Sequence, residues 1–170
     1  MHLPDFLKEE WMKKIEIRHS NIREISQIKK LIVEAYSPIE PLLGRKPRGM
    51  LESEEKVTER VKNKTVYSVL FDGEFIGTFT IKGSAKDNLM EVQKVAVRAD
   101  MQNKGIGTYI MDTAEHLIRL MEEKKVIIET YEDHKQLVDF YLHRGYKVKD
   151  QMLRKGNIVL IMEKNLWRED

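Results

Sequence analysis

A short loop rich in glycine, residues 102–107 with the sequence QNKGIG, carries the clearest chemical signal in this chain. The loop follows a run of β-branched residues and opens directly into a segment whose apolar residues recur at helical spacing. Gly105 and Gly107 lack side chains that would keep a ligand away, and the unpaired N–H groups of a first helical turn attract negative charge. Lys104 adds a full positive charge. These features predict a site for an anion such as a pyrophosphate.

The same two glycines would also suit a plain tight turn between a strand and a helix, and for an isolated G-x-G this would be the better interpretation. The spacing matches neither the dinucleotide fingerprint G-x-G-x-x-G nor the Walker pattern G-x-x-x-x-G-K-S/T. The usual nucleotide-binding families are therefore not indicated, whereas a ligand that carries a pyrophosphate still fits.

Two motifs in this chain resemble signatures of the GNAT acetyltransferases. Residues 102–107 match the pattern Q/R-x-x-G-x-G/A after a V-x-V-like strand, and residues 140–146, FYLHRGY, look like F-Y-x-x-x-G-F/Y. The resemblance covers the chain from residue 15 to about residue 164, because the order of strands and helices also follows the family pattern. It implies an acetyl-CoA-dependent N-acetyltransferase, an acyltransferase that passes acetyl directly to a primary amine without a covalent enzyme intermediate.

The resemblance also implies which residues hold acetyl-CoA. The pyrophosphate would lie on the backbone of residues 102–108, and the pantetheine arm would pair like a strand with residues 95 and 97. His134 stands where many relatives carry an asparagine, and its imidazole can also bond to pantetheine, although it can equally well cap the helix start. The predicted cofactor-binding residues are Val95, Ala96, Val97, Gln102, Asn103, Lys104, Gly105, Ile106, Gly107, Thr108, His134, Leu137 and Tyr141.

Acetyl transfer from a thioester requires a neutral amine, a hydrogen-bond donor for the carbonyl oxygen and protonation of the leaving thiolate. The resemblance assigns the backbone N–H near Val97 to the carbonyl oxygen and the phenol of Tyr141 to the sulfur. Tyr141 also lies four residues after Leu137 on an apolar stripe, so it can be a core residue. Both roles are compatible, because a tyrosine can bury its ring and present its hydroxyl to a cleft.

Glu91 is the predicted general base, because it lies six residues before Val97, where several relatives carry an acidic residue. The competing interpretation is an exposed charge at the strand start, or a partner for Lys94. Glu129 and His134 are weaker alternatives for the base, and an amine can also enter already deprotonated.

The acceptor is expected to meet residues 37–50, SPIEPLLGRKPRGM, together with the neighbouring helix and the last hairpin. Three prolines and two glycines predict an irregular loop here. Tyr36, Arg45 and Arg48 are the predicted acceptor-binding residues, since arginine can receive a carboxylate or a phosphate; a solvated run of charges is the alternative. A small-molecule amine is preferred as acceptor. A peptide amine, acetylated by a protein N-terminal or lysine acetyltransferase, and a non-catalytic CoA-binding regulatory module remain open.

Helices and strands that position these residues can be predicted along the whole chain. Asn21 and Glu24 form a capping signal for a helix whose buried stripe is expected to include Ile22, Ile25, Ile32 and Tyr36. Ser53 is expected to cap a second helix, and the pair Asp72 and Gly73 predicts a hairpin. Further strands are predicted at 15–20, 90–97 and 126–131, with two more at the end of the chain.

This pattern predicts one α/β (α+β) domain of GNAT type, with a mixed central sheet of about six to seven strands flanked by helices on both faces. We expect the domain to occupy residues 15–170. Residues 1–14 are expected to form a helical N-terminal extension, because Pro4 precedes apolar residues at helical spacing.

The overall composition argues against several other classes. Lys and Arg number 30 against 28 Asp and Glu, so the net charge of +2 gives no broad basic field for nucleic acid. The absence of cysteine excludes disulfides, thiolate metal sites and a cysteine nucleophile, and no HExxH motif predicts a metal site. Without a secretory signal or a membrane span, we expect a cytoplasmic protein with no membrane partner, either a monomer or a homodimer.

Overall fold

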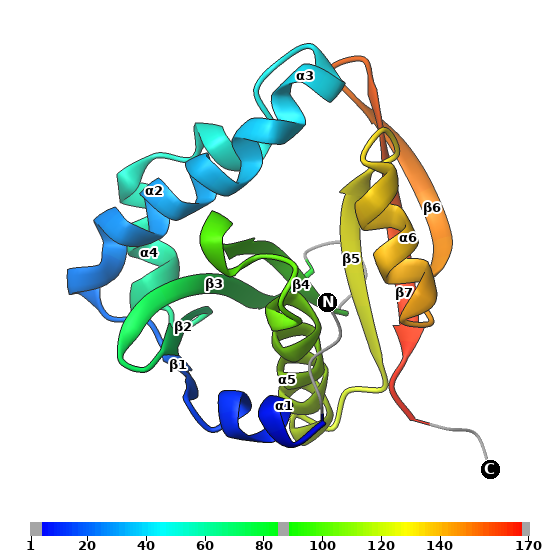
Figure 1. Cartoon of the computed structure of the whole chain (residues 1–170). Helices are drawn as coiled ribbons and strands as arrows, with labels where there is room; N and C mark the ends of the chain where they lie inside the picture. The colour runs from blue at the N-terminus through cyan, green and yellow to red at the C-terminus, as the bar shows by residue number, and fades with distance from the viewer. Residues whose placement is uncertain (1–4, 85–88, 168–170) are drawn as a thin grey trace.

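The computed structural model describes residues 5–84 and 89–167, and in these residues seven strands form one mixed sheet in the order β1-β2-β3-β4-β5-β7-β6 (Figure 1). Neighbouring strands are antiparallel, except that β4 and β5 run parallel. This arrangement confirms the predicted fold class. The strands are β1 Ile15–His19, β2 Val66–Phe71, β3 Glu74–Gly83, β4 Met90–Val97, β5 Lys125–Tyr131, β6 Lys147–Arg154 and β7 Asn157–Asn165.

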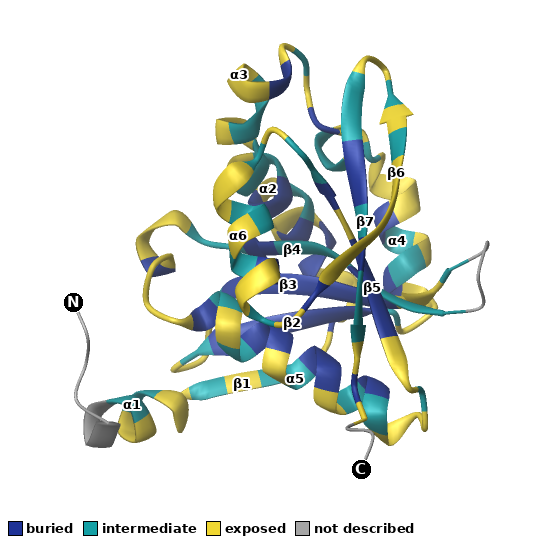
Figure 2. Cartoon of the chain, turned by 90° about the vertical axis from the view of Figure 1, so that its right-hand side faces the viewer, coloured by how far each residue is buried: buried dark blue, intermediate teal, exposed yellow. Residues whose placement is uncertain are grey.

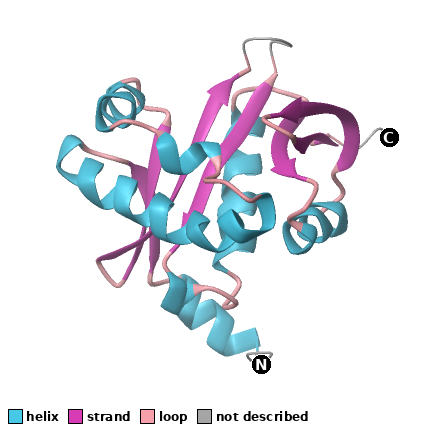
Figure 3. Ribbon diagram, turned by 90° about the horizontal axis from the view of Figure 1, so that it is seen from above, coloured by secondary structure: helices cyan, strands magenta, loops and turns pink. Residues whose placement is uncertain are grey.

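Helices cover both faces of the sheet (Figure 3). One core cluster joins α2 and α4 to Val66 and Ala96, and the larger cluster joins α5 and α6 to the opposite side of the same strands. Figure 2 shows β2 and β3 buried along most of their lengths, whereas β6 is largely exposed. The helices are α1 Asp5–Met12, α2 Ile25–Tyr36, α3 Glu40–Leu43, α4 Glu54–Lys62, α5 Ile106–Leu120 and α6 Lys135–His143.

The predicted capping signals form, with one correction to the buried stripe. The Asn21 side chain accepts a hydrogen bond from the Arg23 N–H, and the Glu24 carboxylate accepts one from the Asn21 N–H, both at 3.0 Å. Ile22, however, is 64% exposed, so the prediction that it is buried was wrong. It lies in a 3-10 turn, Ile22–Glu24, that precedes α2 and has a different rotation per residue, so its side chain points away from the buried face.

Residues 37–50 are mostly helical, in contrast to the irregular loop that their prolines and glycines predicted. A 3-10 helix, Ser37–Ile39, continues into α3, and a second 3-10 helix, Arg48–Leu51, follows. Pro38 and Pro41 each stand in the first turn of a short helix, where the missing N–H costs no hydrogen bond. Gly44 then ends α3 in the left-handed region, with φ of +70°.

The sheet opens between β4 and β5, and this opening positions the candidate site. The two strands pair only at Met90 with Val126 and at Glu91 with Ile127. Because β4 continues to Val97, its later residues have no strand neighbour on that side among the residues that the structure describes. A β-bulge contributes to the divergence: Thr78 lies opposite Ala96 while Thr80 lies opposite Gln93, which leaves one extra residue in β4.

At the N-terminal side, α1 packs against the end of the sheet through Trp11, whose ring lies 5.1 Å from that of Phe71. The division into an extension of residues 1–14 and a domain of residues 15–170 remains a prediction. Across the described part of the chain, none of the helices is both long and apolar enough to span a membrane.

Candidate active site

A cavity of about 740 Å³ lies in the opening between β4 and β5. Its walls come from segments far apart in the sequence: the end of α2, the second 3-10 helix, most of β4, the glycine-rich loop, the end of β5 and one face of α6. Twelve of the predicted site residues line this cavity: Tyr36, Arg48, Glu91, Val95, Ala96, Val97, Gln102, Asn103, Gly107, His134, Leu137 and Tyr141.

The glycine-rich loop leaves open space in front of the first turn of α5. Gly105 is the N-cap residue of this helix, with φ of +84°, and no atom lies within 4 Å of a Cβ built on Gly105 or Gly107. The first N–H groups of α5 have no partner within the helix and can meet a ligand there. Ile106 is 1% exposed and belongs to the core, so only its backbone is placed to contact a ligand. Lys104 and Gly105 in the loop, and Thr108 just after it, are exposed and do not line the cavity.

The backbone of β4 presents two residues to the cavity. The Gln102 Nε2 atom donates to the Val97 carbonyl at 2.8 Å, whereas the Arg98 N–H donates to Ile76 of β3 at 2.8 Å. Because the N–H and C=O of one residue in a strand point to the same edge, the Val97 N–H also faces away from β3. By alternation Val95 faces the same way, so an extended ligand can pair with this edge, which fits the pantetheine arm of CoA.

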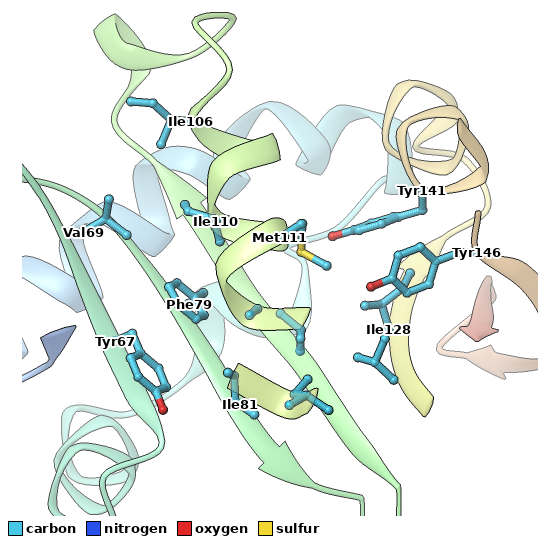
Figure 4. Packing of buried hydrophobic residues seen from close by; sticks show 14 of the residues in the cluster. Tyr67, Val69, Phe79, Ile81, Ile106, Ile110, Met111, Ile128, Tyr141 and Tyr146 are labelled. Carbon is cyan, nitrogen blue, oxygen red and sulfur yellow. The ribbon is translucent and has the colours of Figure 1, made fainter. Parts of the chain in front are cut away.

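Tyr141 combines a buried ring with a position on the cavity wall. The residue is 5% exposed, and its ring packs edge-on against Phe140 and Tyr146, with centroids 5.3 and 5.4 Å away. Figure 4 shows the side chain pointing from α6 toward Met111 of α5. Burial raises the pKa of Tyr141 to about 12, and the nearby Glu115 adds to this effect. The phenol therefore keeps its proton at neutral pH and acts as a donor.

Glu91 lies in the cavity wall at the point where β4 and β5 separate. Burial raises the pKa of Glu91, and the neighbouring Glu129 raises it further. Glu129 itself is paired with Arg154 at 3.1 Å, whereas Glu91 has no ion pair with any residue that the structure describes. Lys94, the alternative partner considered from sequence, lies 3.6 Å from Glu52 instead. A carboxylate of this kind is suited to accept a proton.

His134 is the N-cap residue of α6, but its side chain makes no capping hydrogen bond. The alternative role as a cap is therefore not observed. The imidazole is partly buried, and this burial lowers the pKa of His134, so it is neutral at pH 7 and can both donate and accept hydrogen bonds. Together with Leu137 it lines the α6 side of the cavity.

Tyr36 closes the opposite side of the cavity, at the end of α2. Burial raises the pKa of Tyr36, and Tyr141, which also lines the cavity, contributes to the shift. The Tyr36 ring lies directly on Gly49, because a Cβ added there would stand 2.4 Å from the ring. Gly49 is therefore required for the position of this ring, a constraint that sequence reasoning missed.

The two predicted acceptor-binding arginines lie in different environments in the structure. Arg48 lines the cavity, whereas Arg45 does not, because its guanidinium is engaged elsewhere. Arg45 Nε donates to Asn157 Oδ1 at 2.8 Å and Nη2 donates to the Arg154 carbonyl at 2.8 Å. Arg45 also stacks over the Tyr131 ring at 5.7 Å. These contacts tie residues 37–51 to the turn between β6 and β7, as the proximity of α3 to that turn shows (Figure 1).

A partly buried ionic network beside the cavity was also missed. Arg60 Nε and Nη2 donate to the Glu52 carboxylate, which also lies 3.6 Å from Lys94 Nζ, and Arg60 Nη1 donates to Thr80 Oγ1 at 2.6 Å. The partners come from the segment before α4, from α4 itself, from β3 and from the bulge of β4. No local spacing in the sequence could have indicated that they meet.

The family model described as the acetyltransferase (GNAT) family matches residues 26–146. This match spans more than half of the chain, and the chain therefore belongs to that family of acyltransferases, as the two sequence motifs predicted. No curated protein matches the chain.

Solved structures of similar fold include acetyltransferases determined with their cofactor. A PaiA N-acetyltransferase from Thermoplasma acidophilum in complex with coenzyme A is 21% identical, with a TM-score of 0.72 over 89% of this chain and 98% of that one. The yncA protein from Salmonella typhimurium with acetyl-CoA is 13% identical, with a TM-score of 0.70 over 92% and 96%. N-acetylglutamate synthase from Neisseria gonorrhoeae, with coenzyme A and N-acetyl-glutamate, is 18% identical, with a TM-score of 0.70 over 91% of this chain and 35% of that one.

Proposed function

We propose that this chain takes acetyl from acetyl-CoA and transfers it to the primary amine of a small molecule. The observation that carries the proposal is the meeting of three features on one cavity of about 740 Å³: the loop of residues 102–107, the free edge of β4 and the Glu91 carboxyl group. The coenzyme A and acetyl-CoA in similar structures support the choice of donor.

The residues present fit acetyl-CoA along the length of the cavity. The open space in front of Gly105 and Gly107 suits the pyrophosphate, and the exposed edge at Val95 and Val97 suits the extended pantetheine arm. His134 and Leu137 would complete the wall on the α6 side. When bound, the cofactor supplies an activated acetyl thioester.

Glu91 would act as the general base, and Tyr141 would act as a hydrogen-bond donor. Glu91, with its raised pKa, would take a proton from the acceptor ammonium so that the neutral amine can attack. As the C–N bond forms and the C–S bond breaks, Tyr141 would donate a hydrogen bond to the departing sulfur, and the proton that the acceptor nitrogen loses would neutralise the thiolate. Because the pKa of Tyr141 is about 12 and that of a thiol is about 8.5, this phenol stabilises the thiolate rather than giving up its proton outright.

Residues 37–51 and the turn between β6 and β7 meet at the acceptor end of the cavity, and this contact favours a small acceptor. Residues 37–51 are joined to the turn between β6 and β7 through Arg45 and Asn157, so the acceptor end is bridged from both sides. A protein chain would need an open groove at this place. The test is release of free CoA from acetyl-CoA with small primary amines, compared with peptides that offer an N-terminus or a lysine. Release with peptides alone would contradict the small-molecule acceptor, and no release with either would favour a regulatory module that only binds CoA.

Glu91→Gln is expected to lower kcat/KM at neutral pH by about 10²- to 10⁴-fold, the usual contribution of a positioned base. In the wild type, activity should fall on the acid side with an apparent pKa above the value of about 4.3 for an ordinary glutamate, because the base must be deprotonated and its pKa is raised. The pH dependence of kcat/KM, measured for both proteins, checks this.

Glu129→Gln provides the matched control for that profile. Glu129 raises the pKa of Glu91, so its neutralisation should move the acid limb to lower pH without abolishing it. An identical pH profile for Glu91→Gln and the wild type would remove Glu91 from the base role.

Arg48→Ala should raise the acceptor KM and leave the acetyl-CoA KM unchanged, because Arg48 lines the cavity and is proposed to contact the acceptor rather than the cofactor. Arg45→Ala should instead destabilise the fold by about 1–3 kcal/mol, since it removes hydrogen bonds from a charged donor. Steady-state kinetics and thermal unfolding of the two variants separate these roles. Equal rises in both KM values for Arg48→Ala would contradict its place at the acceptor end.

A further inference from the structure

Lys94 occupies an unusual position in the cavity wall. It lies at the β-bulge of β4 with φ of +52°, a left-handed conformation that is uncommon for residues other than glycine. Its side chain is 20% exposed, and the residue lines the cavity next to Val95, on the proposed acetyl-CoA edge. The backbone conformation thus places an amine group in the wall of the proposed acceptor site.

The negative charge beside Lys94 is shared with a second cation. The Glu52 carboxylate accepts hydrogen bonds from Arg60 Nε and Nη2 and lies 3.6 Å from Lys94 Nζ, so two positive charges face one negative charge. The Glu52 and Arg60 side chains are 10% and 13% exposed, which limits screening by water. Burial lowers the pKa of Lys94, and Arg60 lowers it further. An anionic ligand would therefore stabilise this ammonium group.

Other cations face the same part of the cavity. Arg48 and Lys82 line the wall, and both lower the pKa of Lys94. The Arg48 guanidinium has no ion pair or side-chain partner in the part of the chain that is described. On the opposite side, Glu129 is neutralised by Arg154, which leaves Glu91 as the carboxyl group of the cavity without an ion pair to a described residue.

We propose that the acceptor is an amine that carries an anionic group, a carboxylate or a phosphate, which binds to Lys94 with the help of Arg48. The amine would then lie toward Glu91, on the same strand. This inference rests on the proposed acetyltransferase function and adds the class of substrate to it.

The test measures free CoA released by the wild type with matched primary amines of equal chain length. The set contains ω-amino acids, their carboxamides, aminoalkyl phosphates and diamines, each with two to five carbons between the groups. We expect kcat/KM to be about 10- to 100-fold higher for an anionic amine than for its neutral or cationic counterpart, as one charge-assisted hydrogen bond supplies. Comparison of kcat/KM between the ω-amino acids and the aminoalkyl phosphates identifies which anion is preferred.

Three variants test whether Lys94 is responsible. Lys94→Gln should reduce the preference for the anionic amine to about one-fold, and Lys94→Arg should keep most of it, with the acetyl-CoA KM unchanged in both. Lys64→Gln is the matched control: Lys64 also has a positive φ, of 56°, but it is exposed in the turn before β2. Thermal unfolding identifies any variant that fails to fold, and the wild-type preference tests the substrate class by itself.

The outcomes separate this inference from the function on which it rests. Acetylation of carboxamides or diamines at rates equal to or above those of the anionic amines would overturn the inference and leave the acetyltransferase function intact. A preference for anionic amines that survives in Lys94→Gln would overturn the role of Lys94. No CoA release with any primary amine would overturn the proposed function itself.

Discussion

Gly105→Glu should abolish measurable binding of acetyl-CoA while leaving the protein folded. The new side chain would enter the open space in front of α5, where the pyrophosphate is expected, and bring a negative charge against it. At a separation of about 5 Å and an effective dielectric constant of about 20, the repulsion is about 3 kcal/mol, or roughly 100-fold in affinity, before any steric blocking. Titration calorimetry with acetyl-CoA measures the loss.

The control for Gly105→Glu must separate ligand exclusion from backbone strain. Gly105 has φ of +84°, where a side chain costs about 1–2 kcal/mol. Gly73 has the same φ of +84° in the exposed turn between β2 and β3, also with no atom within 4 Å of an added Cβ. Gly73→Glu should therefore lose similar stability and keep its affinity for acetyl-CoA. Unchanged affinity in Gly105→Glu would refute the placement of the phosphate groups.

Tyr141→Phe should lower turnover by about 10²- to 10³-fold, the usual cost of removing one hydrogen-bond donor from a developing negative charge, with little change in acetyl-CoA affinity or stability. The phenylalanine ring keeps the edge-on contacts with Phe140 and Tyr146, so the core is preserved. What disappears is the hydroxyl at the cavity wall, which is protonated at neutral pH because its pKa is raised to about 12. Single-turnover kinetics with an accepted amine measures the chemical step directly.

Tyr146→Phe is the natural comparison, because it removes the hydroxyl of the adjoining ring. Tyr146 does not line the cavity, and its buried ring packs edge-on against that of Tyr141. Its loss should leave turnover unchanged. If both variants retain full turnover, Tyr141 is a packing residue; if both lose it equally, the effect comes from disturbed packing rather than from the loss of a hydrogen bond to the sulfur.

Local sequence determined the parts of this protein that depend on neighbouring residues. Asn21 and Ser53 cap their helices, and Asp72 with Gly73 turns the hairpin, because each acts on backbone groups within a few residues. The glycine-rich loop belongs to the same class, since its glycines and the first turn of α5 are contiguous. The error at Ile22 was also local: a 3-10 turn replaced the first turn of the predicted helix.

Only the tertiary structure decided which side chains share the cavity. Arg45 and Arg48 are three residues apart and chemically alike, yet Arg45 is held by Asn157, 112 positions away, while Arg48 faces the cavity. Lys94 similarly depends on a bulge in β4 and on Glu52 from before α4. Sequence determined the phosphate loop because its groups are adjacent in the chain, whereas the acceptor end arises from sheet divergence and long-range pairing, which no local spacing encodes.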